Sequence, residues 1–145
     1  MKETYSLNSD PLPKPPVPHD CVIQKLEIRD NFLRITFEDD ISRHDSIKHL
    51  KPEAKSLIMR FHLPDDPDDR DNLLIRLESP VRFRRQQCRI LNISQLEKLT
   101  KDNSRLEYID HYASCSTNSL IVILGGSSTV HMEMTTYFIE YDWIL

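Results

Sequence analysis

The segment LEIRDNFLRITF, residues 26–37, alternates apolar and polar side chains on both sides of the dipeptide Asp30-Asn31. Alternation with a period of two is typical of half-buried β-strands, and two polar turn-forming residues between such runs favour a tight turn. We therefore predict a β-hairpin over residues 22–38.

The same alternation recurs through most of the chain. Residues 57–63 and 73–77 predict a second hairpin with a long acidic tip, and residues 82–93 predict a strand with a basic exposed face. Four further strands are expected at residues 106–112, 119–124, 129–134 and 137–143. The only two glycines stand in a Gly-Gly-Ser-Ser turn that would join the middle two of these four.

Helix signals are sparse. Ser94 precedes Glu97 by three residues, which is the spacing of a capping box, so a short helix is expected to follow and to end near residue 102 or 103. A loop with one short helical turn is expected near residues 44–50. The predicted fold class is α+β, mostly β, with an antiparallel curled sheet or barrel of about seven to nine strands and one short helix.

The N-terminal residues differ in composition from the remainder. Five of the nine prolines lie within residues 1–18, and proline favours an extended backbone that lacks N–H donors. We predict a proline-rich arm over residues 1–18 outside the core, which either packs along the domain or serves as a docking peptide. A single β-rich domain is expected over residues 19–145.

The net charge and the cysteine content limit the kinds of partner and the cellular compartment that we expect for the protein. A net charge of −4 argues against general nucleic-acid binding and favours a basic partner. Three cysteines without a Cys-x-x-Cys pair, in a sequence lacking the features of a signal peptide, predict reduced thiols and a cytoplasmic protein. The longest apolar run, residues 120–124, is too short to cross a membrane, so no membrane span is expected.

The acidic segment from Pro64 to Asn72 is the first candidate site. Its carboxylates suit the steering and binding of a basic protein, and we predict that they bind a partner: Asp65, Asp66, Asp68, Asp69 and Asp71. A solvated tip is the simpler interpretation. Calcium is a weaker alternative, because the segment lacks the glycine and the terminal glutamate of an EF-hand loop.

The second candidate is aromatic. Tyr137, Tyr141 and Trp143 fall on one face of the last predicted strand, where they would form either part of the core or a partly open protein-binding surface. We include these three residues in the predicted partner-binding site.

Catalytic and metal sites have less support. The spacings of His19, Cys21, His111 and Cys115 fit no common zinc site, and no nucleophile elbow, phosphate-binding glycine loop or metalloprotease motif is present. No catalytic residue, metal or cofactor is therefore assigned, and the protein is predicted not to be an enzyme. The basic run Arg82, Arg84, Arg85 and Arg89 is interpreted as an exposed strand face rather than a nucleic-acid site.

Two N-terminal segments, PHDCVIQKL at residues 18–26 and FLRITFED at residues 32–39, carry a family resemblance. They resemble the opening of small bacterial immunity proteins of polymorphic or contact-dependent toxin systems, in which a His-Asp-Cys or His-Asp-Ser tripeptide precedes an apolar strand and a hairpin that ends in an acidic turn. The resemblance implies a cytoplasmic inhibitor that neutralises one cognate toxin, possibly a nuclease, by direct binding. It brings no catalytic residues.

Three hypotheses follow. The first is an immunity protein for a basic toxin domain, and the second is an interaction or regulatory domain with another protein partner. The third, with less support, is a metal-dependent enzyme.

Overall fold

The computed structural model describes residues 1–9, 12–79, 87–101, 105–114 and 118–145. Its ten strands form one open sheet in which every neighbouring pair is antiparallel. In spatial order the strands are β1 (Lys2–Ser6), β10 (Phe138–Ile144), β4 (Ser56–His62), β3 (Phe32–Phe37), β2 (Val22–Arg29), β7 (Leu106–Ser114), β8 (Ser119–Gly125), β9 (Thr129–Thr135), β5 (Leu73–Ser79) and β6 (Gln87–Leu91). The predicted mostly-β class and curled antiparallel sheet are confirmed, and the sheet does not close into a barrel.

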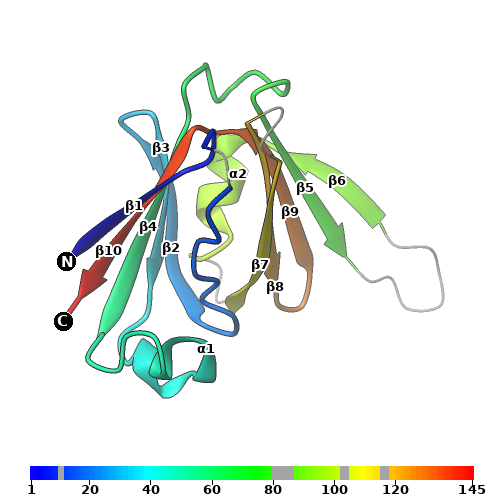
Figure 1. Cartoon of the computed structure of the whole chain (residues 1–145). Coiled ribbons are helices and arrows are strands. Elements are labelled where there is room, and N and C mark those ends of the chain that lie inside the picture. The colour runs from blue at the N-terminus through cyan, green and yellow to red at the C-terminus, as the bar shows by residue number, and fades with distance from the viewer. Residues whose placement is uncertain (10–11, 80–86, 102–104, 115–117) are drawn as a thin grey trace.

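The sheet divides into two leaves that are joined by a short ladder. Strands β1, β10, β4, β3 and β2 form the first leaf, and β7, β8, β9, β5 and β6 form the second. Only Val22 and Ile23 of β2 pair with β7, and a register shift in β2 follows at once. Beyond this junction the leaves separate, and their apolar inner faces supply most of the core (Figure 1).

Helix α2 (Ile93–Lys98) lies between the two leaves (Figure 1). The Glu97 carboxylate accepts a hydrogen bond from the backbone N–H of Ile28 on β2 at 3.1 Å, and Leu96 is fully buried. The helix therefore satisfies a strand N–H at a point where β2 has no pairing with β7.

The helix begins earlier than the sequence predicts. Asn92 is the N-cap and exchanges hydrogen bonds with Gln95 in a capping box, so the prediction of Ser94 and Glu97 in these roles is wrong. Asn is an equally good cap, and Glu97 is already bonded to β2. The short helical turn near residues 44–50 is present as α1 (Asp45–Lys48), preceded by the 3-10 helix η1 (Ile41–Arg43).

The turn chemistry agrees with the sequence at two hairpins. Asp30 and Asn31 adopt φ values of 53° and 63°, as a two-residue turn between β2 and β3 requires. Strands β8 and β9 are joined after Gly125, as the Gly-Gly-Ser-Ser motif predicts.

The second predicted hairpin does not exist. Strand β4 pairs with β3 and β10 in the first leaf, whereas β5 pairs with β9 and β6 in the second. Residues 63–72 are therefore a crossover between the leaves. Alternation with a period of two shows which side chains face the core but does not identify a strand's partner, so it could not separate the two arrangements.

The N-terminal residues take a larger part in the fold than an arm outside the core would. Residues 2–6 form the edge strand β1, and Leu7 is buried at 1% exposure. Residues 12–18, here called the proline strap, run between the leaves in extended form (Figure 1). Pro16 O accepts a hydrogen bond from Tyr141 on the first leaf, and Pro15 O bonds to His111 on the second. Prolines suit this position because they bring no N–H that would need a partner.

Candidate functional site

Four loops meet at one end of the molecule, which we call the acidic end. Backbone hydrogen bonds from Leu63 N to Asn31 O (2.8 Å) and from Thr135 N to Asn72 O (3.0 Å) hold the crossover of residues 63–72 against the β2–β3 turn and against β9. Leu7 N donates to Tyr137 O at 2.8 Å, which fastens the end of β1 to the β9–β10 turn. The candidate residues are therefore carried by a connected set of loops (Figure 1).

The predicted acidic residues divide into two groups. Asp66 Oδ1 accepts the N–H of Asp68, and Asp69 Oδ1 accepts the N–H of Asp71, each at 3.0 Å, so Asp66 and Asp69 build local turns. All five carboxylate residues, Asp65 included, are exposed. The loop is therefore an ordered negative surface, and Asp65, Asp68 and Asp71 can lose their charge without loss of a turn acceptor.

An aromatic cluster lies at the base of this loop, and we define it as Phe32, His62, Tyr137 and Phe138. The rings of His62 and Phe138 stack at 4.6 Å, and Phe32 meets both edge-on, at 5.5 Å from His62 and 6.0 Å from Phe138. Tyr137 lies 6.2 Å from His62 and is 40% exposed. Strand β4 ends at His62, so the cluster stands directly beside the start of the acidic crossover.

The structure corrects two of the three predicted aromatic contacts. Tyr141 and Trp143 are 0% and 1% exposed and stack on each other within the core. They face inward because their positions are in phase with the buried residue Ile139 of β10. Of the three, only Tyr137 is exposed enough to touch a partner.

Sequence reasoning missed three members of the aromatic cluster, although a signal was present. Phe32, His62 and Phe138 occupy the polar phase of their strands, alternating with buried residues. A ring in the polar phase of a strand lies on the outer face. Three such rings on paired strands indicate a surface cluster. The sequence alone does not show which strands pair or in what register, so it could not bring the three rings together.

The His-Asp-Cys tripeptide has a structural position. The imidazole Nδ1 of His19 lies 2.8 Å from Ile109 O, and Asp20 N donates to Tyr108 O at 2.9 Å, so the tripeptide fastens the proline strap to β7. Burial raises the pKa of the Cys21 thiol to about 11, which keeps it protonated. In the described part of the chain no three His, Cys, Asp or Glu side chains come together as metal ligands.

His111, a residue of β7, is buried against the proline strap. Its Nε2 donates to Pro15 O at 3.2 Å, which is possible only if Nε2 carries the proton, and its Nδ1 therefore accepts the hydroxyl of Tyr108 at 2.7 Å. This neutral tautomer satisfies both ring nitrogens. Burial lowers the pKa of His111 from its usual 6.5, against smaller opposite effects of Pro15 and Asp110.

We expect the lowered pKa of His111 to make stability depend on pH. The unfolded chain binds a proton near pH 6.5 while the folded chain does not, so stability is complete above pH 6.5 and falls as pH decreases below it. Urea unfolding of the wild type and of His111→Gln between pH 7.5 and 5 measures this. An equal slope of unfolding free energy against pH in both proteins would contradict the prediction.

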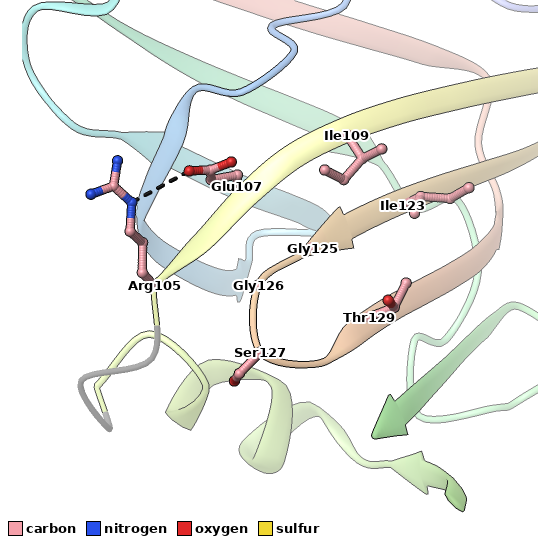
Figure 2. Close-up of a pocket in the computed structure, with 8 residues that line it drawn as sticks. All are labelled: Arg105, Glu107, Ile109, Ile123, Gly125, Gly126, Ser127 and Thr129. Carbon is pink, nitrogen blue, oxygen red and sulfur yellow. Dashed lines mark ion pairs between the residues drawn. The ribbon is translucent and has the colours of Figure 1, made fainter. Parts of the chain in front are cut away.

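The outer face of the second leaf carries a hollow of about 570 Å³, shown in Figure 2. Ile109 and Ile123 form its apolar part, and Arg105 pairs with Glu107 at 3.4 Å beside them. A Cβ on Gly126 would overlap the carbonyl oxygen of Arg105, so glycine is needed for this close approach. With one cationic and one anionic side chain, the lining of this hollow has no net formal charge.

Two predicted features lie partly outside the described residues. Arg82, Arg84 and Arg85 of the basic run fall there, as does Cys115. Arg89 lies on β6 and is exposed, as expected for a strand face in solvent. No helix among the described residues is long and apolar enough to cross a membrane.

Comparison of the chain with protein-family models, with curated proteins and with solved structures found no match.

Proposed function

We propose that the protein works by binding a basic protein domain through its acidic end. The observation that carries this proposal is that the exposed carboxylates stand on the crossover that begins directly after His62 of the aromatic cluster. Exposed rings provide anchor contacts at protein interfaces, and a neighbouring field of negative charge accelerates encounter with a positive surface. The two features act on different stages of one binding event, and the same set of bonded loops carries both.

We further propose that the partner is a toxin domain, so that the protein acts as an immunity protein in the bacterial cytoplasm. Support comes from the resemblance of residues 18–26 and 32–39 to such proteins, and from the acidic surface, which suits a basic nuclease. In this model the protein neutralises the toxin by covering it. An interaction domain for a different basic protein would use the same surface.

The first experiment is capture of the partner from the source cell with the intact chain as bait, at low and then moderate salt. We expect one basic protein at near-equal stoichiometry, and co-expression should then restore the growth of cells that produce that protein. A captured protein whose toxicity is unaffected by co-expression would exclude the immunity role and leave the binding function in place.

Tyr137 provides a direct test of the surface. We expect Tyr137→Ala to weaken binding of the captured partner about tenfold or more, because an anchoring ring contributes roughly 2 kcal/mol or more. Tyr112→Ala is the matched control, since Tyr112 is 56% exposed and lies on β7 of the second leaf, whereas the cluster belongs to the first. Calorimetry measures both. If Tyr112→Ala lost affinity and Tyr137→Ala did not, the interface would lie on the second leaf instead.

A further inference from the structure

A second feature lies on the outer face of the first leaf. A hollow of about 460 Å³ is lined by four cationic side chains, Lys2, Arg29, Arg34 and Arg60, by the carboxylates of Asp30 and Glu140, and by the ring of Phe32. Its lining has a net charge of +2, whereas the whole chain has a net charge of −4. The volume lies within the range of small-molecule sites.

The cross-strand register places two of these cations against each other. Arg34 of β3 and Arg60 of β4 are directly opposite, an arrangement that is unfavourable for like charges on one sheet face. Both side chains are largely buried, at 30% and 20% exposure, which increases their repulsion. A negative group between Arg34 and Arg60 would therefore stabilise the folded protein.

The neighbouring carboxylates supply only part of this negative charge. Arg34 Nε lies 3.7 Å from Glu27, which is also paired with Lys25 at 3.0 Å. Arg60 Nη1 lies 3.6 Å from Asp142. Both of these atoms are buried, and neither forms a hydrogen bond within the described part of the chain. Because both arginines also line the hollow, their remaining guanidinium N–H groups are the donors that an oxyanion there can reach.

From this arrangement we propose that the hollow binds the phosphate group of a small organic phosphate. Arg34 and Arg60 donate to the phosphate oxygens, since the guanidinium group matches phosphate geometry. Lys2 and Arg29 add positive charge at the rim, and Phe32 gives a planar apolar wall for a ring attached to the phosphate. The hollow adjoins the surface proposed for the protein partner and shares Phe32 with it.

The test is NMR titration of the intact protein at low salt with adenosine monophosphate, inorganic phosphate and adenosine. We expect saturable shifts of the amides of β3 and β4 with both phosphates, stronger binding of the nucleotide than of inorganic phosphate, and no binding of adenosine. Equal binding of the two phosphates would overturn the role of Phe32. Binding of adenosine alone, or of neither phosphate, would overturn the proposal.

Substitutions locate the donors. Arg34→Gln and Arg60→Gln should each weaken nucleotide binding about tenfold or more, since each removes a charged hydrogen-bond donor. Their melting temperatures show whether the fold is kept, because each substitution relieves the like-charge pair and also removes the ion-pair partner of Glu27 or Asp142. Arg105→Gln, on the other leaf, is the control and should bind normally. If either glutamine variant unfolds, Arg60→Lys keeps the charge without the planar fork and should still bind more weakly than the wild type. Unchanged affinity in a folded Arg34 or Arg60 variant overturns the assignment.

Discussion

Replacement of Asp65, Asp68 and Asp71 by Asn is expected to slow association with the captured basic partner about tenfold or more at low salt. The three carboxylates are exposed at the acidic end, where their field reaches an approaching positive surface before contact. The Debye length is about 10 Å at 0.1 M salt, so the difference between variant and wild type should shrink as salt is added. Stopped-flow association at several salt concentrations measures both effects.

The choice of residues follows from the structure. Asp66 and Asp69 are left in place because their carboxylates accept backbone N–H groups, and their replacement by Lys would disrupt the loop as well as its charge. A matched control neutralises three exposed carboxylates near η1 and α1, at the other end of the molecule: Glu38→Gln, Asp39→Asn and Glu53→Gln. The net charge changes equally in both variants. Equal slowing in both would show that overall charge, rather than the acidic end, governs association.

Trp143→Ala is expected to lower the free energy of unfolding by about 3–5 kcal/mol, the usual cost of removing a large buried ring. Trp143 is 1% exposed and stacks on Tyr141 at 5.8 Å, and Tyr141 in turn donates to Pro16 of the strap. The cavity would therefore open beside a contact between the strap and the first leaf. Urea unfolding at pH 7.5 gives the value.

The neighbouring residue supplies the control for Trp143. Ile144 lies on the same strand with the opposite orientation and is 40% exposed, so Ile144→Ala should cost less than about 1 kcal/mol. At temperatures where Trp143→Ala remains folded, its affinity for the partner should match the wild type. If the fully folded variant bound the partner more weakly, Trp143 would contribute to the interface after all.

The sequence was informative wherever a local rule determined the structure. The positive φ values of Asp30 and Asn31, the turn after Gly125 and the burial of alternate residues all follow from chemistry within a few positions. These rules were enough for the fold class and for the first hairpin. They also placed the five loop carboxylates in solvent, because so dense a charge cannot be buried without partners.

What the sequence could not supply is long-range pairing. Nothing local indicates that β4 and β5 belong to different leaves, or that β1 pairs with β10 at the far end of the chain. The aromatic cluster and the opposed pair Arg34 and Arg60 both depend on that pairing. The sequence correctly placed Tyr141 and Trp143 on one face of the last strand. It could not show that this face meets the core, because that depends on the opposite leaf and on the strap.

The order of strands in the first leaf sets the order of events during synthesis. Strand β1 and the proline strap are synthesised before the other strands, yet among the described strands β1 pairs with β10 alone, and Pro16 accepts its hydrogen bond from Tyr141. At about 5–20 residues per second, these early segments wait several seconds for residues 138–144 to emerge. Tyr137 immediately precedes β10, so the proposed binding end is completed in the same late step. A growing chain that lacks β10 therefore does not yet present the complete acidic end.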